Sequence, residues 1–208
     1  MQKIVVVLLV IVGFIFLMKK CSPSRSKEVT FKGVWKLKEE NGIAGTSSET
    51  LQTVTVDRRL FRIEYKGEEA DSTSVYDGDL LHTKRVFHPV TAMAGVDGAG
   101  FLSEPMVSSE KPTEGTLIHL RFWSHSYPGQ AGPGGQVAGQ DTVLYQGREN
   151  RPEGEVTVQA WVDTRTGIVL KSVMTIYSSQ VEQMVTKTTL ECQQVQYGPV
   201  DKTAFAKP

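Results

Sequence analysis

The sequence predicts a mainly β protein: a single antiparallel sheet, curled into an incomplete barrel with a lid segment, and preceded by one N-terminal hydrophobic helix. Three observations lead to this prediction. Short segments alternate apolar and polar residues with the period of two that a half-buried strand requires. Turn signals such as Asp77-Gly78 separate these segments, and an uncharged apolar run precedes them. A sheet of roughly nine to eleven sequential strands twists and curls, although a two-sheet sandwich is the alternative.

The chain divides into three parts: an N-terminal membrane anchor or signal segment at 1–20, a linker at 21–30 and a β domain at 31–208. The apolar run Ile4–Met18 is short for a spanning helix, but flanking lysines can extend toward the headgroups. Three fates stay open for it: a retained anchor, which we favour, a cleaved signal, or a lipoprotein signal ending at Cys21. Lys19-Lys20 occupies the places where a lipoprotein signal needs small residues,.

The strand signals begin directly after the linker. Phe31–Leu37 alternates apolar residues with lysines, as expected for a strand with one wet face,. The stretch Leu51–Val86 then contains several short strands joined by tight turns. Within it, Phe61, Ile63 and Tyr65 alternate with charged residues, so these three side chains are predicted to share one buried face.

The middle of the chain breaks this rhythm. His88–Gly115 contains three prolines and a group of apolar residues that includes Met93 and Phe101. A loop of this length is usually functional or disordered, and its apolar residues indicate that it packs on something; a plain surface excursion is the alternative. Thr116–Trp123 is predicted to form a strand, and the Gly- and Pro-rich segment Tyr127–Gln140 a mobile loop.

Four more strands are predicted toward the C-terminus, at Asp141–Glu149, Glu155–Asp163, Ile168–Tyr177 and Val181–Tyr197. A hairpin loop with glycine at its end, Asp163–Gly167, joins the second of these strands to the third. Pro199 ends the last strand because proline cannot donate a ladder hydrogen bond.

Charge is distributed unevenly along the chain. Residues 1–27 hold five basic and no acidic residues, which leaves 18 basic and 23 acidic residues in the remainder. A mildly acidic domain lacks the basic footprint that nucleic acid requires, so no nucleic-acid partner is expected. The basic end lies beside the apolar run, where it would meet anionic headgroups. Taken alone, the positive-inside rule would keep the domain in the cytoplasm.

No set of residues in the sequence has the spacing of a catalytic or metal site. The four histidines, His82, His88, His119 and His125, match no zinc pattern. Neither a nucleophile elbow nor a phosphate-binding loop is present. With no nucleophile–base pair visible along the chain, an enzyme, a cofactor and a metal are not expected, and a small hydrolase ranks last among the functions considered.

Several stretches resemble the periplasmic lipoprotein-carrier superfamily (LolA/LolB-like). They are RRLFRIEY followed by SVYDGDLLH, then VQAWVDTRTGIVLKSVM at Val158–Met174, and VQYGPVDKTAFAKP at Val195–Pro208. The pieces come in the order of that family and span most of the chain after residue 30. The resemblance implies a curled sheet that holds an acyl chain under a lid, on the extracytoplasmic side of a membrane. It also implies an arginine that holds the lid, for which Arg58 or Arg59 lies near the expected place.

Candidate ligand-binding residues are the aromatic and other large apolar side chains of the predicted strands: Phe61, Ile63, Tyr65, Trp123, Trp161 and Met174. Candidate lid contacts are Arg58, Met93 and Phe101. The alternative for each apolar residue is ordinary core packing. The expected function is a membrane-tethered domain that binds a lipid acyl chain or a lipidated protein. The alternative is a protein-binding sensor or docking module of the same fold.

Overall fold

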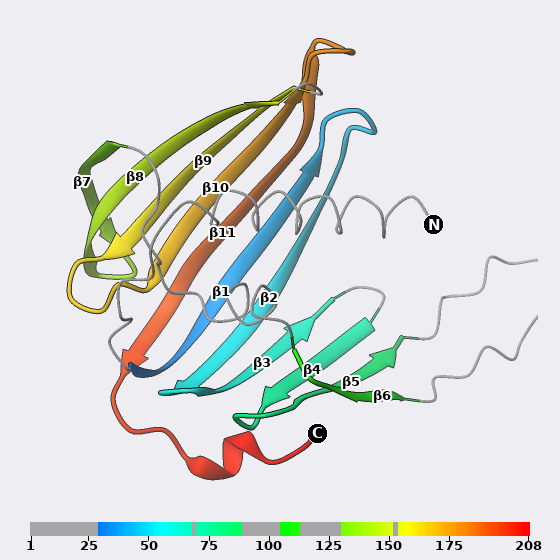
Figure 1. Cartoon of the computed structure of the whole chain (residues 1–208), viewed down its shortest axis with the longest axis vertical. Helices are drawn as coiled ribbons and strands as arrows, with labels where there is room; N and C mark the ends of the chain where they lie inside the picture. The colour runs from blue at the N-terminus through cyan, green and yellow to red at the C-terminus, as the bar shows by residue number, and fades with distance from the viewer. Residues whose placement is uncertain (1–28, 68–69, 89–104, 113–129, 152–153) are drawn as a thin grey trace, which may run out of the picture. The chain divides into compact units, whose positions relative to one another are not determined.

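A computed structural model describes residues 29–67, 70–88, 105–112, 130–151 and 154–208 (Figure 1). These residues form eleven strands and one short 3-10 helix. The strands are β1 Thr30–Asn41, β2 Thr46–Asp57, β3 Leu60–Lys66, β4 Ala70–Tyr76, β5 Leu81–Phe87, β6 Met106–Glu110, β7 Gln130–Val137, β8 Gln140–Arg151, β9 Gly154–Asp163, β10 Val169–Ser178 and β11 Gln183–Tyr197, and the helix is η1 Lys202–Phe205.

All eleven strands belong to one sheet, in the order β6-β5-β4-β3-β2-β1-β11-β10-β9-β8-β7. The chain therefore runs outward from β1 to β6, and then returns from β7 at the opposite end of the order to β11 beside β1. Within the described residues this order is open rather than closed into a ring, because β6 and β7 each have one neighbour there. The predicted single antiparallel sheet is confirmed.

The meander predicted at Leu51–Val86 is present as β2 to β5, with each strand antiparallel to the next. The turn between β4 and β5 also agrees with the sequence. The Asp77 N–H donates to the Leu80 carbonyl at 3.2 Å, and Gly78 has a φ of 106°, a conformation that glycine adopts readily,.

Two predictions for the middle of the chain are wrong in part. Met106–Glu110, placed in the lid or loop His88–Gly115, is strand β6 and pairs antiparallel with β5. Gln130–Val137, placed in the mobile loop Tyr127–Gln140, is strand β7 and pairs with β8. Proline is tolerated in β7 because the strand is at the end of the order and its register shifts between Pro133 and Gly135,.

The predicted N-terminal helix and linker fall almost wholly outside the described residues. The same holds for the predicted strand Thr116–Trp123 and for most of the predicted lid. Within the described part of the chain, no helix is long and apolar enough to cross a bilayer.

The described residues fall into two compact units. The β3–β6 unit comprises 29–37, the described residues of 49–112, and 193–208, and it includes η1. The β7–β10 unit comprises 38–48 and the described residues of 130–192. Each unit has its own apolar side chains, and the two are described separately below.

Candidate functional site

One face of the β3–β6 unit is apolar at its centre. Antiparallel register puts Val56 of β2, Phe61 of β3, Tyr76 of β4 and Leu81 of β5 in one row across the sheet. Residues opposite each other on neighbouring strands share a face, so the row forms a continuous strip of side chains. All four side chains are buried, and Phe61 and Val56 have no exposed surface.

The next row of this face changes from apolar to polar across the sheet. Val54 and Ile63 face each other and are buried, with Ile63 8% exposed. Ser74 and Thr83 continue the row, and their hydroxyls lie 3.1 Å apart. The third row of this face contains Tyr65, which is half-buried. We name this surface, formed by Val54, Val56, Phe61, Ile63, Tyr65, Tyr76 and Leu81, the β3 apolar face.

The opposite face of the same strands contacts the C-terminal segment. Arg62 of β3 donates to the Ala204 carbonyl at 3.2 Å and pairs with Glu64 at 2.7 Å. Phe205 in η1 is 9% exposed, and η1 lies against β3. Asp201 caps this short helix by accepting from the Thr203 N–H at 2.9 Å. The C-terminal segment therefore covers part of this face, whereas the β3 apolar face lies on the other side of the strands.

The β7–β10 unit has an apolar face of its own. Val156, Val158, Ala160 and Val162 occupy alternate positions of β9, and all four are buried. Met174 of β10 lies opposite Val158 and is 5% exposed. These side chains, with Val169 and the half-buried Ile176 and Tyr145, form two adjoining clusters.

Trp161 lies on the other side of this unit from Met174. It occupies an odd-numbered position of β9 and pairs with Lys171, whose Nζ is 5.4 Å from the centre of the indole ring. Lys171 in turn pairs with Glu191 at 3.1 Å. The structure therefore does not bring Trp161 and Met174 together, although the sequence placed both among the candidate ligand contacts.

The remaining candidates have different outcomes. Phe61, Ile63 and Tyr65 share one face, as predicted from their alternation. Arg58 is exposed in the turn between β2 and β3, with a φ of 56°, and its N–H donates to the Val29 carbonyl at 3.2 Å. Three candidates lie outside the described residues: Trp123, Met93 and Phe101.

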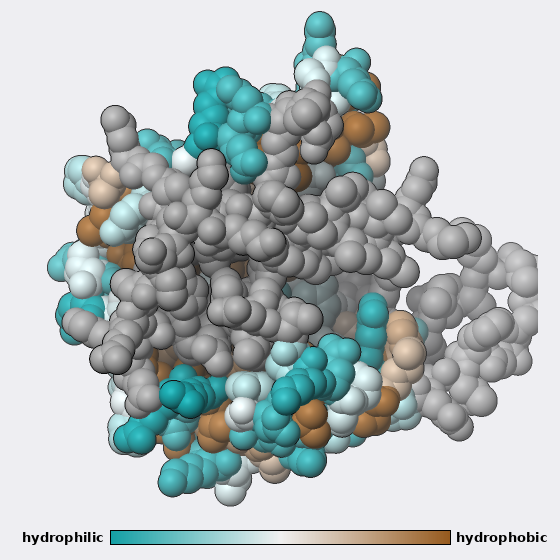
Figure 2. Space-filling model, in the orientation of Figure 1, coloured by the Kyte–Doolittle hydropathy of each residue, from teal (hydrophilic) through white to brown (hydrophobic). Residues whose placement is uncertain are grey.

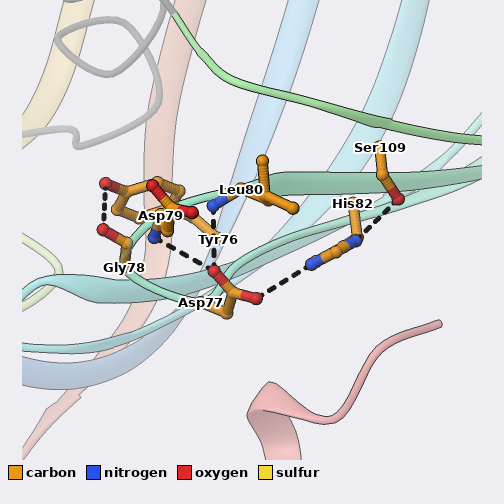
Figure 3. Close-up of polar contacts among 7 residues, drawn as sticks. All are labelled: Tyr76, Asp77, Gly78, Asp79, Leu80, His82 and Ser109. Carbon is orange, nitrogen blue, oxygen red and sulfur yellow. Dashed lines mark hydrogen bonds and ion pairs between the residues drawn. The ribbon is translucent and has the colours of Figure 1, made fainter.

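A polar network at the β4–β5 turn was not predicted (Figure 3). His82 of β5 is 4% exposed, and its Nε2 lies 2.9 Å from Oδ2 of Asp77. Its Nδ1 lies 2.7 Å from Oγ of Ser109 on β6. The other carboxylate oxygen of Asp77 accepts from the N–H groups of Asp79 and Leu80, at 3.0 and 2.9 Å.

These hydrogen bonds stabilise the ionised form of the Asp77 carboxyl. The Leu80 N–H, followed by the His82 ring, holds the pKa of the Asp77 carboxyl well below its ordinary value of 3.8,. Asp77 is ionised at neutral pH, and its Oδ2 accepts a hydrogen bond from Nε2 of His82. Among the described residues, no group of three or more His, Cys, Asp and Glu side chains is arranged to hold a metal ion.

The described surface mixes hydrophilic and hydrophobic residues on the side seen in Figure 2. Among the described residues, six large hydrophobic side chains are strongly exposed: Ile43, Leu51, Met106, Val107, Tyr177 and Val181. Met106 and Val107, each 64% exposed, lie next to each other on β6 at the end of the strand order. β6 therefore combines two features: exposed apolar side chains and a position at the edge of the sheet.

No protein-family model and no curated protein matches the chain. Solved structures do match. A LolA-superfamily protein from Nitrosomonas europaea has 12% identity and a TM-score of 0.36, covering 92% of this chain and 94% of that one. A domain from Vibrio parahaemolyticus, named as a candidate outer membrane lipoprotein-sorting protein, has 10% identity and a TM-score of 0.36, with 96% of each chain covered.

A DUF1329-family protein from Desulfovibrio piger also matches, with 7% identity, a TM-score of 0.34 and 94% of each chain covered. The Nitrosomonas and Vibrio structures carry names from the carrier superfamily that the sequence resembles. This likeness concerns the fold and carries nothing about ligand or activity.

Proposed function

We propose that the chain is a membrane-tethered, extracytoplasmic domain that binds the acyl chain of a lipid or of a lipidated protein on its β3 apolar face. The observation that carries the proposal is the row Val56–Phe61–Tyr76–Leu81, which is apolar across four strands. Within the described part of the chain there is one sheet and no second sheet to pack on this row.

Apolar burial supplies the binding energy in this proposal. Each CH₂ group removed from water contributes about 0.8 kcal/mol. A chain of roughly twelve carbons therefore gains about 10 kcal/mol, which is comparable with the cost of immobilising a ligand. In this proposal the acyl chain packs against the stacked rings of Phe61 and Tyr76, which are buried in the structure, and the hydroxyls of Ser74 and Thr83 mark the polar end of the next row.

The test of ligand binding is mass spectrometry of lipids extracted from protein purified out of cells. We expect an acyl-bearing species to accompany the wild type and to be lost in Ile63→Glu, which places a charge on the β3 apolar face. Thr73→Glu is the matched control, because half-buried Thr73 lies on β4 with its side chain on the other face.

Both variants are checked by circular dichroism, and Ile63→Ala is added because a buried charge can unfold a domain. Ile63→Ala keeps the face apolar but smaller, so it is expected to retain less lipid than the wild type. Equal lipid in all four proteins, or none in the folded wild type, would contradict the proposal.

The tether is the apolar run Ile4–Met18, which lies outside the described residues. We propose that it stays attached and holds the domain outside the cytoplasm. Intact-mass analysis measures whether the mature chain still begins before residue 20, and protease treatment of intact cells measures on which side the domain lies. A mature N-terminus after residue 20, or a domain protected from protease, would contradict this part of the proposal.

The second candidate function is docking of a protein partner, and the exposed edge of β6 favours it. An extended peptide can add to such an edge as a further strand. Met106 and Val107 would then supply apolar contacts. Val107→Lys is expected to remove this interaction and to leave the extracted lipid unchanged, so the two candidates are separable.

A further inference from the structure

Three side chains of the β3–β6 unit are arranged as a nucleophile, a base and a group that orients the base (Figure 3). Ser109 Oγ lies 2.7 Å from Nδ1 of His82, and Nε2 of His82 lies 2.9 Å from the Asp77 carboxylate. Both distances are within hydrogen-bond reach, so the three groups form the hydrogen-bonded chain that activates a serine, with the two ring nitrogens exchanged relative to the serine-protease triad,.

The direction of the two hydrogen bonds follows from the charge of Asp77. A carboxylate can only accept, so the His82 ring donates a hydrogen bond from Nε2 to it. The tautomer with its one ring proton on Nε2 has a lone pair on Nδ1, which accepts a hydrogen bond from the Ser109 hydroxyl. The ring is 4% exposed, and ring rotation would break both bonds, so its orientation is well defined.

Ser109 is open to solvent although its base is buried. It lies on β6, all five residues of which are exposed. The two carboxylate oxygens of Asp77 have different partners. Oδ1 accepts from two backbone N–H groups of the turn, and Oδ2 contacts the His82 ring. The turn therefore orients the carboxylate independently of Ser109.

We propose that Ser109, His82 and Asp77 hydrolyse small carboxylic esters, with Ser109 as nucleophile, His82 as general base and Asp77 as a positioning residue. The Ser109 oxygen forms a bond to the acyl carbon and its proton passes to Nδ1; the bond from the acyl carbon to the alkoxy oxygen then breaks, and that oxygen takes the proton from Nδ1 and leaves as the alcohol. Water next bonds to the acyl carbon and gives one proton to Nδ1; the bond from the acyl carbon to the serine oxygen breaks, and the serine oxygen takes that proton back. The net reaction converts ester and water into acid and alcohol.

The basic residue that follows Ser109 most closely in the sequence is Lys111. It follows Ser109 by two residues, its side chain is 82% exposed, and its pair with Asp79 spans 4.0 Å. An exposed pair at that distance holds the ammonium weakly, so the ammonium is free to approach the oxyanion that forms on the acyl group.

This site is separate from the β3 apolar face. His82 shares its row with Val75 and Arg62, whereas Leu81 shares its row with Tyr76 and Phe61. Adjacent strand residues point to opposite faces, so the ester reacts on one side of the strands and the proposed acyl chain binds on the other. Failure of one proposal therefore leaves the other standing.

The test uses the purified full chain and an alkyl fluorophosphonate, which bonds to an activated serine and releases fluoride. We expect a single covalent adduct by intact mass, located at Ser109 by peptide mapping. Ser109→Ala is expected to abolish it, and His82→Gln to slow it at least about tenfold. Lys111→Ala is expected to slow it less.

Two matched controls accompany these variants. Ser108→Ala removes the neighbouring exposed serine, which pairs with Thr83 and faces the other way. His88→Gln removes a second histidine that contacts a carboxylate, with Nε2 3.3 Å from Oδ1 of Asp71. Both controls are expected to react at the wild-type rate. No adduct in the wild type, or an equal rate in Ser109→Ala, overturns the proposal.

A second measurement remains informative even if the His82→Gln variant does not fold. Ser109→Cys is a change of one atom, and a thiol beside the ring is expected to transfer its proton to Nδ1. At about pH 6, iodoacetamide should alkylate it at least about tenfold faster than the thiol of Ser108→Cys. Peptide mapping separates these products from Cys21 and Cys192. Equal rates would mean that the three side chains only fasten β6 to β5.

Discussion

Phe61 of β3 and Tyr76 of β4 lie directly opposite each other, with their rings stacked at a centroid distance of 5.3 Å and an interplanar angle of 23°. The Tyr76 hydroxyl donates to the Gly78 carbonyl at 2.7 Å. One aromatic pair thus joins the centre of the β3 apolar face to the turn that positions Asp77. The pair is therefore part of the β3 apolar face, and through the Tyr76 hydroxyl it also supports the turn that holds Asp77.

Phe61→Ala is expected to lower the free energy of unfolding by about 3 to 5 kcal/mol, because it removes a side chain with no exposed surface,. Urea unfolding measures the change. The control is Leu60→Ala on the same strand, where the side chain is half-buried, and it should cost clearly less. A similar loss in both variants would contradict the burial seen at Phe61.

Gly78→Val is expected to destabilise the chain by about 1 kcal/mol or more, because valine resists the φ of 106° that Gly78 adopts,. Its Cβ would meet only Leu60 at 3.8 Å, so the cost comes from the backbone and not from a clash. Gly132→Val on β7 is the control, since a Cβ there has no atom within 4 Å. An unchanged urea midpoint for Gly78→Val would show that this turn has another conformation.

Asp77→Asn is expected to lower stability at about pH 6 and to have a smaller effect at about pH 2.5. The folded state holds the pKa of Asp77 below its ordinary value of 3.8. The stabilising contribution of the carboxylate is therefore complete above that value and is lost as the pH falls below it. Urea midpoints of both proteins measure the difference, and a gap that stays constant with pH would be inconsistent with the hydrogen bonds of Asp77.

Phe205→Ala is expected to release the C-terminal segment from β3, because Phe205 is the buried residue of η1. Carboxypeptidase digestion followed by intact mass should then remove more residues than in the wild type. Arg62→Met should give a weaker effect in the same direction, since the Arg62 guanidinium holds the Ala204 carbonyl. Wild-type resistance in Phe205→Ala would mean that another contact holds the segment.

The strands that could be predicted from the sequence are those whose side chains alternate. β3 and β9 show a clear period of two, because one of their faces is buried and the other is wet. β7 was missed because a strand at the end of the order can hold proline and several glycines, and its composition is that of a loop. β6 was missed because all five of its residues are exposed and nothing in their pattern separates it from the surrounding loop.

The polar network could not be predicted for a different reason. Asp77 and His82 are five residues apart, but the register of β5 with β6 alone brings Ser109 to the ring from 27 residues away. The same limit applies to Trp161 and Met174. Both residue types suit an apolar site, but the pairing of β10 with β9 places the two side chains on opposite faces. The Asp201 cap of η1 was not predicted either, although aspartate is a common residue directly before a helix,.

The neighbouring places of β1 and β11 in the sheet have a consequence for synthesis. Roughly 140 residues separate the end of β1 from the start of β11, and at a translation rate of about 5 to 20 residues per second that length takes roughly 7 to 28 seconds to make. β1 therefore emerges early and waits with one edge unmatched until nearly the whole chain has followed. A nascent chain that must keep its earliest strand unpaired for so long is a natural client for a holding chaperone, and a truncated chain that lacks β11 would leave that edge permanently open to other molecules.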